Sequence, residues 1–314
     1  MNRRTFLFLS SAVGLLGLPR IASAAPLKEL RVGFQKTSVL LVVKAQKVLE
    51  NHFEPQGVAV RWVEFPFGPP LLEALNVGAI DFGVAGETPP IFAQAAGAPL
   101  VYLANDPPAP QGEAILVPKD SPLKSVADLR GKKVALNKGS NVHYLLVRAL
   151  EKAGLKYTDI QPVFLAPADA LAAFARGAVD AWVIWDPYEA AAEATTGARI
   201  LADGTGLVAN YQFYLSSRKF LADNGPVVDV VLEALNETDE WAKSNIADVA
   251  RHLSPSIGLP APVLEVSLRR ESYGTLPTDN NVIASQQRIA DTFFALGLIP
   301  KALNVSDLQR KPGS

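Results

Sequence analysis

The sequence contains no cysteine among its 314 residues. This absence excludes disulfide bonds, thiolate metal sites and cysteine nucleophiles, and it excludes a lipid anchor attached to a cysteine behind a signal peptide. Histidine is scarce as well. The three histidines, His52, His143 and His252, lie far apart, and no two of them have the spacing of a metal-ligand pair. We therefore expect no metal ion and no other cofactor.

Long apolar runs are nearly absent. One run covers residues 6–18, which is shorter than the ~20 residues of a bilayer-spanning helix, and no other segment replaces it. It follows Arg3-Arg4 and precedes Ala22-Ser23-Ala24, the small-residue pattern that a signal peptidase cleaves. Residues 1–24 therefore predict an export signal that resembles the twin-arginine type, with a general secretory signal as the alternative. We expect a soluble protein of the periplasm.

A strong charge of either sign is also lacking. The chain has 30 Lys and Arg against 31 Asp and Glu. The predicted signal carries Arg3, Arg4 and Arg20 and no acid, so its removal moves the formal net charge from −1 to −4. A mildly acidic protein is not expected to bind nucleic acid or an anionic membrane. Any anionic ligand must be attracted locally.

From Leu30 onward, short β-rich runs alternate with amphipathic helical patterns, which is typical of an α/β fold with largely parallel strands. The predicted strands are residues 30–34, 58–65, 81–84, 133–136, 163–165, 181–185 and 212–215. The predicted helices are residues 39–51, 71–77, 89–97, 141–153 and 168–176, one from Pro187, and several between residues 226 and 298 that should pack back on the first part of the chain.

A proline-rich segment at residues 105–111 interrupts this alternation, and we expect the chain to cross there into a second domain. The strand at residues 212–215 predicts the return crossing. After the signal, residues 25–110 and 212–314 are therefore expected to form one lobe and residues 111–211 the other.

Three junctions share one local form. In residues 83–90, 137–143 and 180–188, an apolar run suited to a buried strand ends in small or polar residues, and a helical pattern begins at once. The N–H groups of a first helical turn have no partner within the helix, and the positive helix end favours an anion. The three junctions together predict a site for an anionic small molecule.

Six sequence elements stand in a specific order and spacing: Gly33-Phe-Gln-Lys36, Trp62-Val-Glu-Phe-Pro66, Leu72-Glu-Ala-Leu-Asn-Val-Gly78, Pro89-Pro-Ile-Phe-Ala-Gln-Ala-Ala-Gly97, Lys138-Gly-Ser140 and Trp185-Asp-Pro-Tyr188. Through them, residues 30–300 closely resemble the periplasmic substrate-binding proteins of ABC importers, in particular the group that binds aliphatic sulfonates. The resemblance implies a two-lobed type II binding-protein fold, each lobe a mostly parallel sheet flanked by helices, with two crossings between the lobes. It also implies a monomer that closes around an alkanesulfonate and docks on a membrane permease.

A sulfonate is permanently ionised and can only accept hydrogen bonds, so its site must supply donors. The resemblance implies that the sulfonate lies against helix N-termini and that the alkyl tail lies against apolar and aromatic walls. The residues expected to contact ligand are Gln35, Gly86, Glu87, Thr88, Gly139, Ser140, Asn141, Trp185, Asp186, Tyr188 and Tyr214.

Several of these residues have a second interpretation. Thr88 and Ser140 can act as plain helix caps, and Asp186 can cap the helix after Pro187 rather than pair with a ligand amine or a partner across the cleft. The aromatic rings of Trp185 and Tyr188 can belong to the core instead of the tail site. The lysines Lys36 and Lys138 are interpreted as solvated loop residues, with steering of the anion as the alternative.

Other functions remain as alternatives. Taurine-binding and nitrate-type proteins share the expected fold, as do desulfinases and pyrimidine-synthesis enzymes. The desulfinases depend on a cysteine, which is missing, and a cytosolic enzyme is at odds with an export signal. Ser140, His143 and Asp186 could suggest a hydrolytic triad, but the Gly-x-Ser-x-Gly elbow is absent. We therefore expect a binding protein rather than an enzyme.

Overall fold

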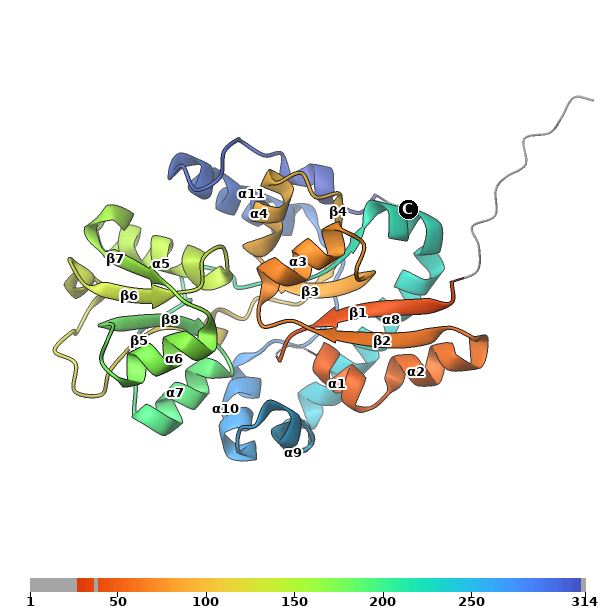
Figure 1. Cartoon of the computed structure of the whole chain (residues 1–314), viewed down its shortest axis with the longest axis horizontal. Helices are drawn as coiled ribbons and strands as arrows, with labels where there is room; N and C mark the ends of the chain where they lie inside the picture. Colours follow the sequence, from red (N-terminus) through yellow and green to blue (C-terminus); the bar gives the residue numbers. More distant parts are fainter. Residues whose placement is uncertain (1–26, 37–38, 312–314) are drawn as a thin grey trace, which may run out of the picture.

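A computed structural model describes residues 27–36 and 39–311. The chain forms two lobes, each built around a five-stranded sheet with helices on its faces (Figure 1). The expected two-lobed α/β architecture is therefore confirmed. The predicted export signal at residues 1–24 lies outside the described residues. Within the described part of the chain, no helix is long and apolar enough to cross a bilayer.

The sheet of the first lobe has the strand order β2-β1-β3-β10-β4. Its strands are β1 (Glu29–Phe34), β2 (Ala59–Glu64), β3 (Phe82–Gly86), β4 (Leu100–Asn105) and β10 (Gln212–Ser217). Strands β2 and β3 run parallel to β1, whereas β10 runs antiparallel to both of its neighbours. The period of two along a strand is visible in β10, because Tyr214 packs in one apolar cluster and Phe213 and Leu215 pack in another.

The sheet of the second lobe has the order β7-β6-β8-β5-β9. Its strands are β5 (Glu113–Val117), β6 (Lys133–Leu136), β7 (Gln161–Phe164), β8 (Ala181–Trp185) and β9 (Arg199–Asp203). Strand β6 is parallel to β7 and β8, and β5 is antiparallel to β8 and β9. The chain passes from the first sheet to the second between β4 and β5, and it returns between β9 and β10.

The α-helices of the described chain are α1 (Leu40–Ala45), α2 (Val48–Phe53), α3 (Gly68–Asn76), α4 (Pro89–Ala95), α5 (Asn141–Lys152), α6 (Pro167–Ala175), α7 (Tyr188–Thr196), α8 (Arg218–Ser244), α9 (Ile246–Ile257), α10 (Ala261–Arg270) and α11 (Asn280–Ala295). Short 3-10 helices are η1 (Glu54–Gln56), η2 (Pro110–Gly112), η3 (Val126–Leu129), η4 (Tyr157–Asp159) and η5 (Val305–Leu308).

One predicted helix is divided in the structure. The apolar spacing predicts a single helix over residues 39–51, but α1 ends at Ala45 and α2 begins at Val48. Lys47 between them has φ of 55°, a left-handed conformation that interrupts a right-handed helix. The prediction of one continuous helix was therefore wrong at this position.

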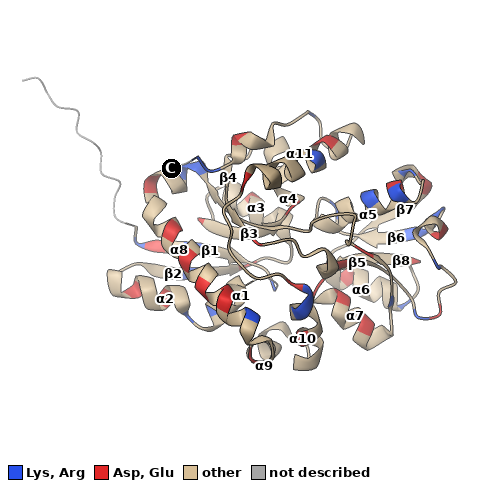
Figure 2. Cartoon of the chain, turned by 180° about the vertical axis from the view of Figure 1, so that it is seen from behind, with Lys and Arg blue, Asp and Glu red and all other residues tan. Residues whose placement is uncertain are grey.

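The helix α10 lies between the lobes. The helices between residues 226 and 298 were expected to pack on the first lobe, but α10 packs against α7 of the second lobe as well as against α9. Figure 2 shows the basic end of α10 next to α7, which carries acidic residues. This helix therefore packs on the first lobe as expected and also contacts the second lobe, where Arg270 forms ion pairs with Asp186, Glu189 and Glu193.

Candidate functional site

A small cavity of about 30 Å³ lies between the two lobes, and we call it the interlobe cavity. It is lined by Gln35, Gly68, Gly86 and Pro89 of the first lobe, by Ser140, Asn141 and Trp185 of the second, and by Asn210 and Gln212 near the start of β10. None of these lining residues of the described chain carries a formal charge. An anion held here must therefore be held by dipoles and hydrogen bonds.

Three helices begin at this cavity. Gly68 opens α3, Pro89 opens α4 and Asn141 opens α5. The helix dipole places partial positive charge at each of these starts. Residues 69, 70, 89 and 90 are prolines without an N–H group, so the free N–H donors of the first turns come mainly from α5. The expected convergence of helix starts is thus present for the junctions at residues 83–90 and 137–143, with α3 as an additional member.

Two polar side chains of the cavity donate hydrogen bonds to backbone carbonyl groups. The hydroxyl group of Ser140 donates to the carbonyl oxygen of Asn137 at 2.7 Å. The amide of Gln35 donates through Nε2 to the carbonyl oxygen of Val84 at 3.0 Å, which uses one of its two N–H groups. The other N–H group of the Gln35 amide remains available to donate to a ligand.

Thr88 lies directly behind the cavity wall and is fully buried. Its backbone N–H donates to Oδ1 of Asn141 at 3.2 Å. Within the described part of the chain its hydroxyl oxygen has no hydrogen-bond partner, and α4 receives no side-chain cap from it. A buried hydroxyl without a partner is costly, so Thr88 has an unused donor beside the cavity.

The two lobes are joined across the cavity by Asn141. Its Nδ2 donates to Oδ1 of Asn210 at 2.6 Å, and Nδ2 of Asn210 donates to the carbonyl oxygen of Ala109 at 2.9 Å. Together with the bond from Thr88, these contacts connect α5 of the second lobe to the first lobe and to both segments that cross between the sheets. This network of hydrogen bonds joins the two lobes.

Two acidic residues predicted for the site lie behind it. Oε2 of Glu87 accepts from the backbone N–H of Tyr211 at 3.1 Å, and burial raises the pKa of Glu87 to about 7. Oδ1 of Asp186 accepts from the N–H of Ala190 at 3.0 Å, the helix-capping contact expected of a residue just before α7. Burial raises the pKa of Asp186 to about 6 despite its ion pair with Arg270. Neither carboxyl group lines the interlobe cavity.

A second cavity of about 140 Å³ adjoins the first, and we call it the aromatic cavity. It is lined by Gln35, Lys36, Glu64, Phe65, Pro66, Trp185, Pro187 and Tyr188. Gln35 and Trp185 line both cavities. The rings of Trp185 and Tyr188 meet edge to face with centroids 6.4 Å apart. The start of α7 therefore faces the aromatic cavity rather than the interlobe cavity.

Two predicted site residues have other positions. Tyr214 is fully buried in the first lobe, where it stacks on Phe82 with centroids 6.1 Å apart. It lies on the same face of β10 as Gln212 but packs in the apolar cluster with Phe82, and it lines neither cavity, so its expected role as a ligand wall remains a prediction. Gly139 has φ of 74°, and its N–H donates to Nδ1 of His143 at 3.3 Å. Gly139 shapes the loop before α5.

The residues of a hydrolytic triad have other partners. Nε2 of His143 lies 3.0 Å from the hydroxyl of Tyr157, while the Ser140 hydroxyl bonds to a backbone carbonyl. Burial, assisted by Lys138, lowers the pKa of His143 to about 4, so it is neutral at neutral pH. Among the described residues, no group of three His, Asp or Glu side chains could hold a metal ion.

Four residues that line the interlobe cavity were not predicted: Gly68, Pro89, Asn210 and Gln212. Gln212 is the first residue of a strand that the sequence did predict, and Pro89 begins a predicted helix. Asn210 has φ of 53°, a conformation that asparagine tolerates better than most residues. The sequence signal for this site residue was an asparagine placed just before the return strand.

Comparison with known proteins gives consistent matches. The family described as NMT1/THI5 like matches residues 43–245. A protein of Escherichia coli (strain K12) named as an aliphatic sulfonates-binding protein is 47% identical over 296 residues, which cover 93% of this chain and 92% of that protein. Both of the solved structures that follow are of binding proteins.

The structure of the alkanesulfonate-binding protein SsuA from Xanthomonas axonopodis pv. citri bound to MOPS has a TM-score of 0.87 and 46% sequence identity, and the match covers 91% of this chain and 99% of that one. The periplasmic aliphatic sulphonate binding protein SsuA from Escherichia coli has a TM-score of 0.85 and 46% identity, with 92% and 94% of the two chains covered.

Proposed function

The chain belongs to the NMT1/THI5-like family, and from this premise we propose that it is an extracytoplasmic solute-binding protein that captures aliphatic sulfonates for an ABC-type importer. The observation that carries the proposal is the uncharged interlobe cavity at which α3, α4 and α5 begin. The names of the relatives with 46–47% identity support the same ligand class.

The chemistry of the cavity suits a sulfonate group. The ligand carries a permanent charge and accepts hydrogen bonds only, and the cavity offers the first N–H groups of α5 together with the second N–H group of the Gln35 amide. Each hydrogen bond to a charged group contributes about 1.5–3 kcal/mol. Three or four of them, with some burial of the tail, reach the roughly −8 kcal/mol of micromolar binding. The alkyl tail then extends between Trp185 and Tyr188 in the aromatic cavity.

The site residues in this proposal divide by cavity. Gln35, Gly86, Ser140 and Asn141 surround the sulfonate, with Thr88 behind them. Trp185 separates the sulfonate from the tail. Glu87, Asp186 and Gly139 support the walls from behind without contacting ligand.

The proposal includes the partner and the compartment. The protein would act as a monomer that delivers its ligand to a membrane permease, without nucleic acid or a cofactor. Residues 1–24 would direct it to the periplasm, with the twin-arginine route favoured by Arg3-Arg4. Residues 25–110 and 212–314 would move as one lobe against residues 111–211.

Isothermal titration of the mature protein tests the ligand class. Ethane-, butane- and hexanesulfonate are titrated beside taurine, nitrate and a pyrimidine. We expect heat from the alkanesulfonates and weaker or no heat from the others. Binding of nitrate or of the pyrimidine without binding of any alkanesulfonate would overturn the proposal, and preference for taurine would move it to the taurine-binding group.

A further inference from the structure

A third cavity, of about 40 Å³, lies in the first lobe under α1, α9 and α10, and we call it the apolar cavity. Its walls are mainly aliphatic. The lining residues are Lys36, Val39, Leu41, Val42, Asp106, Pro187, Asp239, Val249, Leu253, Ile257, Leu264, Ser267, Leu268, Glu271, Ser272 and Tyr273. Leu41, Leu253 and Leu264 are at most 5% exposed, so the middle of the cavity is apolar.

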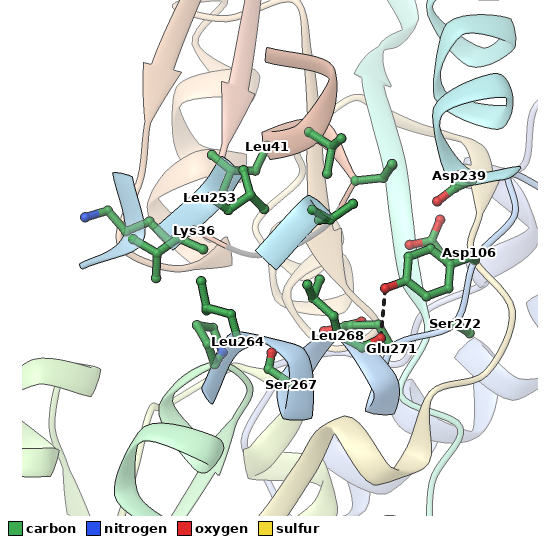
Figure 3. A pocket seen from close by; sticks show the side chains of 16 residues that line it. Lys36, Leu41, Asp106, Asp239, Leu253, Leu264, Ser267, Leu268, Glu271 and Ser272 are labelled. Carbon is green, nitrogen blue, oxygen red and sulfur yellow. Dashed lines mark hydrogen bonds between the residues drawn. The ribbon is translucent and has the colours of Figure 1, made fainter. Parts of the chain in front are cut away.

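The apolar cavity has two different ends. Figure 3 shows Lys36 at one end and Asp106 and Asp239 at the other, with the leucine side chains between them. Lys36 is partly exposed, so its end is the one nearer to solvent. Asp106 and Asp239 are buried, so the opposite end is closed.

The Lys36 end adjoins the aromatic cavity. Lys36 and Pro187 line both the apolar and the aromatic cavities, just as Gln35 and Trp185 line both the aromatic and the interlobe cavities. The three cavities therefore follow one another, each sharing a pair of residues with the next. The cavities therefore adjoin one another in this order, with Trp185 between the first two and Pro187 between the last two.

We propose that the three cavities form one ligand path and that the protein takes long, linear alkanesulfonates whose tail ends are buried in the apolar cavity. This inference rests on the proposed function, because it needs the sulfonate to lie in the interlobe cavity. It adds the length of the tail and the residues that select it. The side chains that contact the tail end are Leu41, Leu253, Leu264, Ser267 and Leu268.

The closed end of the path sets the chemistry of the tail. Asp106 is 6% exposed, and its Oδ1 has no hydrogen-bond partner within the described residues. Oδ2 of Asp239 accepts from the hydroxyl of Thr275 at 3.1 Å. Buried carboxyl groups reject a second anionic group, because an unpaired charge in an apolar site is strongly unfavourable. The path therefore admits an uncharged methyl end and excludes a tail that ends in a carboxylate.

Titration with sulfonates of increasing length tests the path. We expect the affinity to rise from ethane- to butane- to octanesulfonate by about fourfold for each methylene group that enters the apolar cavity. An octanesulfonate analogue with a terminal carboxylate should lose the gain. An affinity that stops rising at butanesulfonate would overturn the path while leaving the sulfonate site intact. Failure of every sulfonate to bind would overturn the proposed function itself.

Two variants with opposite expected effects locate the tail end. Ser267→Leu fills the apolar cavity and should weaken octanesulfonate by about tenfold or more while leaving ethanesulfonate unchanged. Leu268→Ala widens the cavity and should shift the preference toward longer tails. Leu296→Ala, at a surface leucine outside all three cavities, serves as the matched control. Equal length profiles for Ser267→Leu, Leu268→Ala and the unaltered protein would overturn the inference.

Discussion

The side-chain amide of Asn141 packs against Gly86 so closely that a Cβ atom on residue 86 would overlap it. Gly86 ends β3 in the first lobe, and Asn141 opens α5 in the second. The same amide accepts from the N–H of Thr88 and donates to Asn210. Closure of the lobes therefore depends on the absence of a side chain at position 86.

Replacing Gly86 with alanine should hinder closure. The new methyl group must displace the amide of Asn141, which loses its bonds to Thr88 and Asn210. We expect sulfonate affinity to fall by about tenfold or more and the ligand-induced compaction in solution scattering to shrink. Gly225→Ala is the matched control, because a Cβ there meets no atom within 4 Å. Affinity equal to that of the unaltered protein would show that Asn141 does not hold the closed state.

Replacing Ser140 with leucine should block the sulfonate subsite. Ser140 is 4% exposed and lines a cavity of about 30 Å³, so a larger side chain must occupy the ligand volume. We expect affinity to fall by about tenfold or more, with a cooperative thermal transition retained. Ser306→Leu, at an exposed position of η5, should bind normally. If Ser140→Leu binds as tightly as its control, the loop before α5 does not contact ligand.

Replacing Arg270 with leucine should destabilise the protein. Arg270 contacts Asp186 at 3.4 Å, Glu189 at 2.9 Å and Glu193 at 2.6 Å. Removing one partner of a buried ion-pair network costs about 3–5 kcal/mol, because carboxylates remain buried without a counter-charge.

The loss caused by Arg270→Leu should be smaller at about pH 5 than at about pH 8. Burial raises the pKa of Asp186 to about 6, so this carboxyl group is mostly neutral at the lower pH. Urea unfolding at both pH values measures the difference. Arg269→Leu is the control, because Arg269 is exposed and pairs only with Glu265 on its own helix among the described residues. Equal losses for the two arginine variants would contradict the role of the network.

His143 should make stability depend on pH in a definite direction. Burial lowers its pKa from 6.5 to about 4 in the folded protein, so the unfolded chain binds the proton more readily between these values. The neutral ring therefore stabilises the fold fully above about pH 6.5, and this contribution, about 3 kcal/mol, is lost as the pH falls toward 4. Denaturant unfolding of His143→Gln across this range should show a correspondingly smaller loss.

The comparison of His143→Gln with the unaltered protein is needed because other buried groups act in the opposite direction. Burial raises the pKa of Glu87 and of Asp239 to about 7, so these carboxyl groups are protonated in the folded protein and favour it at lower pH. Glu87 and Asp239 are present in both proteins, so their contributions cancel when the free energies of unfolding of the two proteins are subtracted. A difference in stability that does not change with pH would contradict the assignment.

The local patterns of the sequence predict the starts of α4 and α5 at the site, because caps and proline positions act within a few residues. They do not predict contacts that form only when distant segments meet. Asp186 was open to interpretation as a cap or as a partner across the cleft, and its contact with Arg270, 84 positions later, could not be seen in its own surroundings. Asn210 lies in the segment before β10, and its approach to the cavity depends on the relative position of the lobes.

Two elements show the same limit in the fold. The spacing of apolar residues continues from α1 into α2 across the break at Lys47. The hydrophobic pattern therefore does not reveal the positive φ of this lysine. Strand β5 is fully buried, yet it directly follows the proline-rich crossing and was not predicted. Its pairing with β8 and β9, both distant in sequence, supplies the hydrogen bonds that fix it as a strand.

The position of α10 determines how the molecule can open. This helix contacts η2 in one crossing segment and α7 in the second lobe. It therefore lies along one edge of the contact between the two lobes. At the opposite margin α5 and α11 meet through side chains, such as His143 and Phe293 with ring centroids 5.2 Å apart. If the lobes open about the crossing segment beside α10, their displacement will be smallest there and will grow toward α5 and α11. The proposed permease would then meet the largest difference between the loaded and the empty form at that far margin.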